Sequence, residues 1–131
     1  MLKKIILIFA ILAGSFVAGS VVVRRGLLLR YLDQHPDPNW VPPVEYYVGQ
    51  GYYIKQNLTT AATYFIRVAD QYPSSSFAED AYVGYLECIH KENRLSRVEL
   101  IQKHEDYLVR FPKGNHAENI RVRIGAYKSG L

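Results

Sequence analysis

Apolar residues recur at steps of three and four from about residue 44 onward, which is the period of amphipathic α-helices. The clearest run follows Asn57 and contains these apolar positions: Ala61, Ala62, Phe65, Val68, Ala69 and Tyr72. Similar spacing predicts helices over residues 44–56, 58–72, 77–92, 97–111 and 116–128. We therefore expect an all-α domain of five helices, occupying residues 44–131.

Signals for helix starts and ends support these positions. Asn57 can accept a hydrogen bond from the first turn of a helix. Three sites place a Ser or Asn three residues before a Glu, the pattern of a capping box: Ser76 with Glu79, Ser96 with Glu99, and Asn115 with Glu118. Pro43 suits a first helical turn, where a missing N–H costs nothing, and Pro73 ends the helix before it.

A separate apolar segment of 19 residues without a charge begins at Ile5 and ends at Val23. As a helix it would measure about 28 Å, close to the hydrocarbon thickness of a bilayer. Two basic residues flank it on each side, as expected for charges that stay among lipid headgroups. We predict a transmembrane anchor within residues 1–25, embedded in the lipid bilayer. A cleaved secretory signal is the alternative, because residues 18–20 are small enough for a signal peptidase.

Four small residues in this segment share one helix face: Gly14, Ser15, Ala18 and Gly19. Such a face predicts packing against another membrane helix. A flexible end of a signal sequence explains the same residues equally well. Ser15 stands where a bacterial lipoprotein would have its lipid-bearing cysteine, so we expect no lipidation and a protein helix as the anchor.

Residues 26–43 connect this segment to the helical region. Residues 26–34 have leucines and a tyrosine at helical spacing, which predicts a short amphipathic helix at the membrane surface. Four prolines follow within residues 36–43, so we expect residues 35–44 to form an extended connector. Trp40 fits two roles there, as an anchor among headgroups or as a side chain docked on the following helices.

The helical region contains an internal repeat. The segment EYYVG at residues 45–49 recurs as DAYVG at residues 80–84, an offset of 35 residues. The pair Tyr72-Pro73 recurs as Phe111-Pro112, at an offset of 39, so that four extra residues belong to the region of residues 91–94. Repeats of this length indicate pairs of helices stacked in tandem.

These residues resemble the tetratricopeptide repeat, a helix-turn-helix unit with small residues where its two helices touch. The matching positions are Tyr47, Val48, Gly49, Tyr52, Ala61, Phe65 and Pro73. The segment YPSSSFAEDAY at residues 72–82 is similar to the envelope branch of this family, which includes BamD-type assembly lipoproteins and Tol-Pal-associated periplasmic proteins. The resemblance implies an α-α solenoid of about 2.5 repeats.

The resemblance also implies a groove that binds partner proteins and is lined by the first helix of each pair. Carried over by position, its exposed residues would be Tyr46, Gln50, Tyr53 and Ile54 from the first unit, and Tyr85, Cys88 and Ile89 from the second. The chain has 11 tyrosines, a residue that suits adaptable contact surfaces. We expect most of them in the core between helices, and Tyr46, Tyr53 and Tyr85 in the groove.

The charge distribution excludes the main driving force for nucleic-acid binding. Residues 1–30 contain five basic residues and no acidic one, although the whole chain has a net charge of only +4. The remaining 11 basic and 12 acidic residues leave residues 31–131 with a net charge of −1. A nearly neutral helical domain lacks the positive surface that a phosphate backbone requires, so we expect no nucleic acid as a partner.

Catalytic and metal-binding patterns are weak. The four histidines, His35, His90, His104 and His116, lack the spacing of metal ligands, so we expect surface or capping roles for them and no metal or cofactor. Cys88 is the only cysteine, and no histidine and acid accompany it at the spacing of a nucleophile triad. An enzyme with Cys88 as nucleophile is the weakest of the functional hypotheses, and we expect no catalytic residues.

Two functional hypotheses remain. The first is a non-enzymatic, membrane-anchored adaptor or scaffold, an accessory subunit of a larger bacterial membrane or envelope complex. Its lysine-bearing N-terminus would be cytoplasmic, so that the anchor crosses the inner membrane once and the helical domain lies in the periplasm. The second is a soluble periplasmic chaperone or assembly factor, released by signal cleavage. Both bind other protein subunits.

Overall fold

The computed structural model describes residues 26–130 and divides into two units, Met1–Asp37 and Pro38–Leu131. The described part of the first unit contains α2 (Leu27–Gln34). The second unit contains α3 (Val41–Ile54), α4 (Leu58–Gln71), α5 (Ala78–Glu92), α6 (Arg97–Arg110) and α7 (Ala117–Ser129). Residues 26–130 thus form six helices and no strand, which confirms the all-α prediction.

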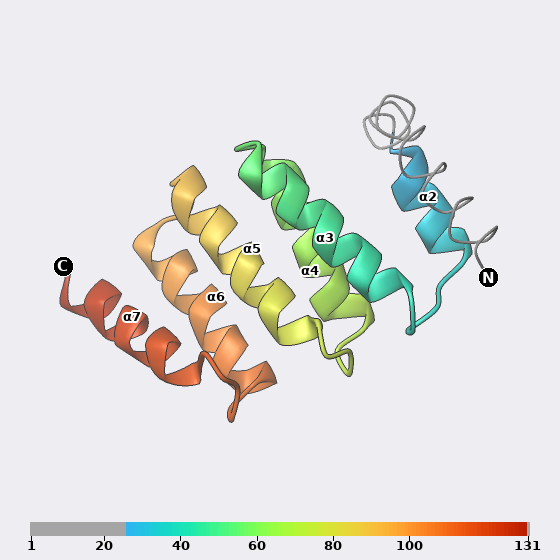
Figure 1. Ribbon diagram of the computed structural model, residues 1–131. Helices are drawn as coiled ribbons and strands as arrows, with labels where there is room; N and C mark the ends of the chain where they lie inside the picture. The colour runs from blue at the N-terminus through green and yellow to red at the C-terminus, as the bar shows by residue number, and fades with distance from the viewer. Residues whose placement is uncertain (1–25, 131) are drawn as a thin grey trace. The chain divides into compact units, whose positions relative to one another are not determined.

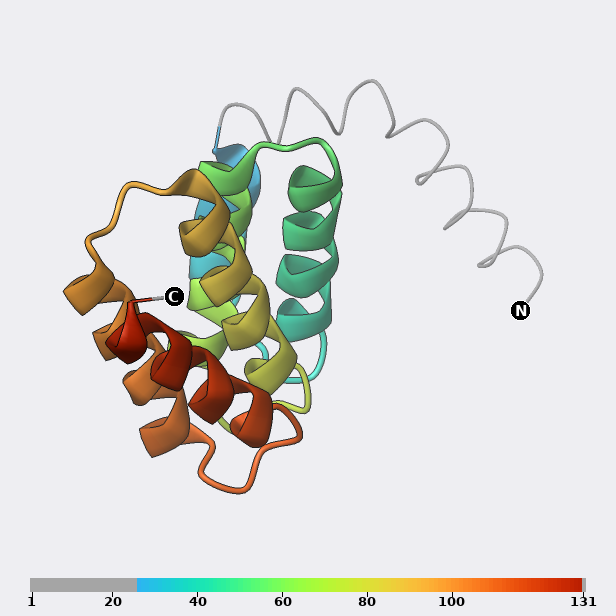
Figure 2. The ribbon, with the colours of Figure 1, turned by 90° about the vertical axis from the view of Figure 1, so that its left-hand side faces the viewer.

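The helices α3 to α7 lie side by side, and successive helices run in opposite directions (Figure 1). Helix α4 packs against both α3 and α5, and α6 packs against both α5 and α7. Helices α3 and α5 run in the same direction and also contact each other (Figure 2). The second unit is therefore built from two antiparallel helix pairs and a fifth helix.

The observed helices match the expected ones to within three residues at every end. The largest difference is at the start of α3, which begins at Val41, so the expectation of an extended connector through residue 44 is wrong. Pro42 and Pro43 lie in the first turn of α3, where their missing N–H groups have no partner in any helix. Trp40 occupies the N-cap position and is 37% exposed.

The described part of the first unit is the short helix that the leucine spacing predicts. Helix α2 begins after Gly26 and ends before its C-cap residue His35, whose ring stacks on Tyr31 with 4.2 Å between ring centroids. Among the helices of residues 26–130, none is both long enough and apolar enough to cross a membrane. The expected anchor lies outside the described residues, and so do its small residues Gly14, Ser15, Ala18 and Gly19.

Two of the four expected helix caps are present. The Asn57 side chain accepts from the amide of Thr60 at 3.3 Å, and Ser96 forms a capping box with Glu99. The other two expectations are wrong, because the N-cap residues of α5 and α7 are Phe77 and His116, and neither side chain forms a cap hydrogen bond. The Glu79 carboxylate instead accepts hydrogen bonds from the Tyr107 hydroxyl and the His116 amide, which tie α5 to the ends of α6 and α7.

The cap at Ser96 gives a prediction with an internal control. Ser96→Ala removes the oxygen that accepts from the Glu99 amide, and we expect it to lower the free energy of unfolding by about 1 kcal/mol. Ser76→Ala removes a serine at the same position of the same sequence pattern that caps nothing, so its effect should stay below about 0.5 kcal/mol. Urea denaturation followed by circular dichroism measures both. Equal effects of the two substitutions would contradict the assignment of the cap.

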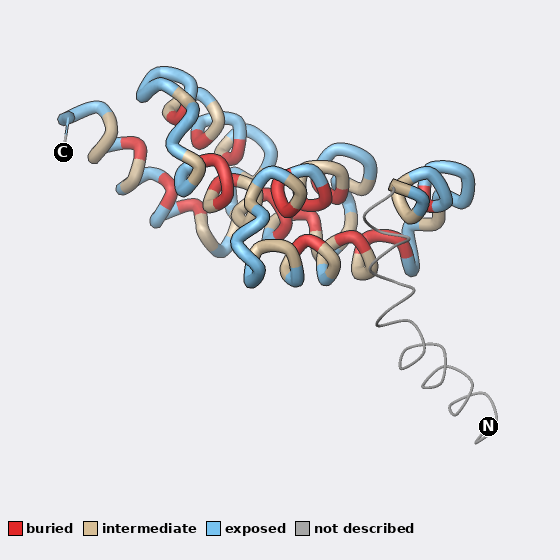
Figure 3. The backbone as a smooth tube through the Cα atoms, turned by 90° about the horizontal axis from the view of Figure 1, so that it is seen from above, coloured by how far each residue is buried: buried red, intermediate tan, exposed pale blue. Residues whose placement is uncertain are grey.

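The core of the second unit consists of two clusters of buried side chains. One lies among α3, α4 and α5 and centres on Phe65, and the other lies among α5, α6 and α7 and includes Ile120 and Ile124. In Figure 3, buried positions lie where the helices of the second unit face one another. Tyr64, Tyr82 and Tyr107 are fully buried, as expected for tyrosines that pack between helices.

A groove between the helices α3 and α5

The second unit contains a cavity of about 350 Å³ between α3 and α5. Its lining consists of Tyr46, Gln50, Tyr53, Phe65, Asp80, Val83, Gly84, Glu87 and His116. Among these residues, His116 lies at the start of α7. We refer to this cavity, with these nine residues, as the groove.

Helix α3 lines the groove with three side chains spaced by four and three residues, so they share one helix face. These are Tyr46, Gln50 and Tyr53, three of the residues that the sequence predicts for a groove. The Gln50 amide donates to the Tyr46 hydroxyl at 3.0 Å, and this bond holds both side chains along the wall. Ile54 is also predicted there, but it is 75% exposed at the end of α3 and does not line the groove.

The floor of the groove is the ring of Phe65, which α4 places between two glycines. A Cβ atom on Gly49 or on Gly84 would lie only 2.9 Å from ring carbons of Phe65. The ring is 1% exposed and therefore fills the space that these two missing side chains leave. The absence of side chains at both glycines thus lets α3 and α5 approach α4 closely enough to share one floor.

Helix α5 lines the opposite wall with Asp80, Val83, Gly84 and Glu87, which the sequence analysis did not select. The residues predicted for this wall are Tyr85, Cys88 and Ile89, and none of them lines the groove. Cys88 is 0% exposed and Ile89 is 7% exposed, so the prediction that they are exposed is wrong. Tyr85 is half-buried and packs against Tyr82 with 5.6 Å between ring centroids.

The error on α5 has a geometric cause. The repeat offset of 35 residues transfers each position of α3 to the equivalent face of α5. A groove between two parallel neighbours instead takes side chains from the facing flanks of the two helices, which are not equivalent faces. The observed wall matches an offset of 34, since Tyr46, Gln50 and Tyr53 lie opposite Asp80, Gly84 and Glu87.

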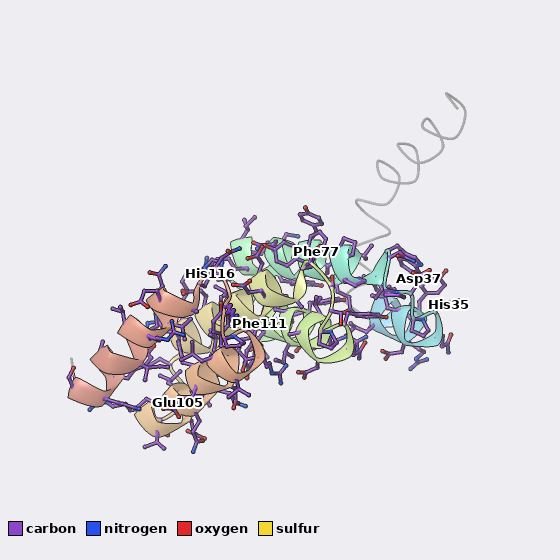
Figure 4. All side chains as sticks on the ribbon, turned by 90° about the horizontal axis from the view of Figure 1, so that it is seen from below. His35, Asp37, Phe77, Glu105, Phe111 and His116 are labelled. Atoms are coloured by element: carbon purple, nitrogen blue, oxygen red, sulfur yellow. The ribbon has the colours of Figure 1, made fainter. Side chains whose placement is uncertain are left out.

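The two carboxylates in the groove have different partners. Glu87 binds the Arg123 guanidinium at 2.6 Å, whereas Asp80 contacts the imidazole of His116 at the longer distance of 3.2 Å. The Asp80 side chain is 58% exposed and the Glu87 side chain 31%. Figure 4 labels His116, which lies at the start of α7. Asp80 therefore is the more accessible and the less firmly neutralised of the two charges.

A lysine already lies on an aromatic ring at the edge of the groove. The Lys91 ammonium is 4.4 Å from the centroid of the Tyr53 ring, a cation–π geometry. The contact with Tyr53 also raises the pKa of Lys91. This end of the groove thus accommodates a positive charge on an aromatic face.

The single cysteine does not line the groove but lies in the core between α3, α4 and α5. Burial raises the pKa of the Cys88 thiol to about 11, so the thiol stays protonated at neutral pH. Its surroundings therefore disfavour the nucleophilic thiolate that the weakest hypothesis requires. No three metal-ligating side chains come together within residues 26–130.

The four histidines differ in their surroundings. His35 occupies the C-cap of α2 and His116 the N-cap of α7, in line with the expected capping roles. His90 forms a hydrogen bond with Tyr127, in which its Nδ1 lies 2.7 Å from the hydroxyl oxygen. The expectation is wrong for His104, which is fully buried. Its Nδ1 donates to the Leu100 carbonyl at 2.7 Å, and within the described chain its Nε2 has no hydrogen-bond partner.

The buried His104 predicts a pH dependence of stability. Burial lowers its pKa below the ordinary value of about 6.5, so below that pH the unfolded chain binds a proton that the folded chain does not. The free energy of unfolding should therefore fall as the pH drops from 7.5 to 5.5, and His104→Met should reduce this fall. Urea denaturation at both pH values measures the difference. An identical fall in both proteins would contradict this role of His104.

The lining of the groove is a mixture of aromatic, amide and carboxylate side chains around the ring of Phe65. Such a surface can hold a side chain that has an apolar stem and a polar end, and it has enough room for a few side chains of a bound segment. It brings together three of the predicted residues of α3 with residues of α5 that were not predicted for a groove. No family model matches this chain, and none of the curated proteins matches it either.

Proposed function

We propose that the protein is a non-enzymatic adaptor or scaffold, anchored in a membrane, whose helical domain binds a segment of a partner protein in the groove. The observation that carries this proposal is the groove itself. Its two walls come from α3 and α5, whose facing lining residues are 34 positions apart in the sequence, and its floor comes from α4 between them. The stacked helix pairs support the resemblance to tetratricopeptide repeats, whose first helices line such grooves.

The proposal includes a larger assembly and a location. The apolar segment that begins at Ile5 supports a single-pass anchor in a bacterial inner membrane, with the helical domain in the periplasm. We also propose that the protein is an accessory subunit of a larger membrane or envelope complex.

Site-specific photocrosslinking tests the groove. A photoreactive phenylalanine analogue replaces Gln50 in the full-length chain, and the same analogue replaces Val109, which is 81% exposed on α6, as the matched control. We expect one protein to crosslink from position 50 and not from position 109. The same protein should co-purify with the unmodified chain and be lost with Tyr46→Ala.

Two results would contradict the proposal. One is equal crosslinking from positions 50 and 109, which would indicate contacts without specificity. The other is the recovery of the full-length protein alone after gentle detergent extraction. The intact mass measured on the same sample distinguishes the alternative, since a mature chain that begins near Val21 would support the soluble periplasmic chaperone.

A further inference from the structure

The charges that line the groove are of one sign. Asp80 and Glu87 are both in the lining, and among the described residues no lysine or arginine is. Two cations contact lining residues from outside it: Lys91 lies over the Tyr53 ring, and Arg123 pairs with Glu87. Asp80 faces the cavity with only an imidazole as its partner.

The same unit already binds a guanidinium group at another place. Arg110 lies with its guanidinium carbon 5.0 Å from the centroid of the Tyr82 ring, and it binds the Asp70 carboxylate at 2.6 Å. An aromatic ring and a carboxylate from two neighbouring helices thus enclose one arginine. A carboxylate–guanidinium pair supplies the charge, and the ring supplies a cation–π contact.

The groove offers these two components without an arginine in the lining. Tyr46 from α3 and Asp80 from α5 line one cavity, and Val83 and Gly84 provide an apolar part of its wall. A basic side chain has an apolar stem and a charged end, which matches this arrangement. A free acidic side chain would instead meet two carboxylates.

We infer that the groove recognises a basic side chain, arginine or lysine, on the bound segment of the partner protein. The stem lies along Val83 and Gly84, and the charged end displaces His116 from Asp80. This inference rests on the proposed function and names the chemistry of the segment that the groove takes.

Nuclear magnetic resonance tests the inference with the full-length, ¹⁵N-labelled protein in nonionic detergent micelles. The probe is Nα-acetyl-arginine methylamide, and the control probe is the citrulline analogue, which has a similar shape and no charge. A single side chain should bind with a dissociation constant in the millimolar range, about 1 to 20 mM. We expect the arginine probe to shift the amide signals of Asp80, Val83 and Gly84, and to bind at least about fivefold more tightly than citrulline.

Two substitutions give a second measurement. Asp80→Asn removes the charge with little change of shape and should weaken arginine binding at least about fivefold. Glu118→Gln removes an exposed carboxylate outside the groove and should leave binding unchanged. The comparison of arginine with citrulline uses the unmutated protein, so it decides the question even if Asp80→Asn alters the fold.

The inference is overturned if citrulline binds as tightly as arginine, if Asp80→Asn has no effect in a folded protein, or if the shifted signals lie outside the groove. Its failure is distinct from that of the proposed function. If a partner crosslinks from position 50 but the arginine probe does not bind, the proposed adaptor function stands and only the recognition of a basic side chain is contradicted. If the arginine probe binds but no partner crosslinks, the proposed adaptor function is contradicted instead.

Discussion

Phe65→Ala should lower the free energy of unfolding by about 3–5 kcal/mol, the usual cost of deleting a buried aromatic side chain. Phe65 is 1% exposed and lies between the backbones of Gly49 and Gly84. Neither glycine has a side chain that can move into the space left by the ring, so the cavity should persist. The effect should therefore lie in the upper part of the range for a core substitution, and urea denaturation followed by circular dichroism measures it.

Ile54→Ala provides the matched control for this prediction, because Ile54 is an apolar residue of α3 that is 75% exposed. Its loss should change the free energy of unfolding by no more than about 0.5 kcal/mol. A cost below about 1.5 kcal/mol for Phe65→Ala would mean that α3 and α5 collapse onto α4 when the ring is absent. In that case the ring would not be what holds the floor of the groove.

The helices could be predicted from the sequence because local signals define their ends. Asn57 and Ser96 act within four residues of themselves, and Pro73 and Pro112 block continuation of α4 and α6 wherever the rest of the chain lies. The predicted start of α3 is three residues too late because Pro42 was assigned to the extended connector, although Pro43 was expected in a first helical turn. In a first turn the same residues are compatible with a helix.

The two wrong cap predictions show what a local sequence pattern cannot predict. Ser76 and Glu79 have the same spacing as Ser96 and Glu99, yet Glu79 binds Tyr107 and His116, which are 28 and 37 residues away. A pattern of four residues cannot show that a carboxylate has a stronger partner in another helix. Gly114 belongs to the same junction, since a Cβ atom there would lie 2.6 Å from the Glu79 carboxylate oxygen.

The α3 wall of the groove could be predicted from the sequence, but the α5 wall could not. Of the α3 residues that the resemblance implies, Tyr46, Gln50 and Tyr53 do line the cavity, because they share one face of the helix. The face of α5 depends on how two helices are rotated relative to each other, which a repeat offset does not encode. Asp80 and Glu87 could have been found from the sequence only by assigning the two facing flanks of the helices separately.

The second large effect is expected at a buried ion pair between α3 and α4. The Glu45 carboxylate is 0% exposed, and Arg67 binds it with an N–O distance of 2.9 Å. Arg67→Met keeps the apolar part of the side chain but leaves the carboxylate without this cation in a place where water cannot solvate it. We expect the free energy of unfolding to fall by about 3–5 kcal/mol at pH 7.5, the usual cost of removing one partner of a buried pair.

A double substitution distinguishes the effect of the ion pair on stability from the effect of side-chain shape. Glu45→Leu with Arg67→Met removes both charges, so it should be at least about 2 kcal/mol more stable than Arg67→Met alone. Arg121→Met is the matched control, because Arg121 pairs with Glu118 at 3.4 Å on the exposed surface and should cost less than about 1 kcal/mol. If Arg67→Met cost no more than Arg121→Met, the Glu45 carboxylate would have to gain water or another partner when Arg67 is lost, and the pair would not determine how α3 is held on α4.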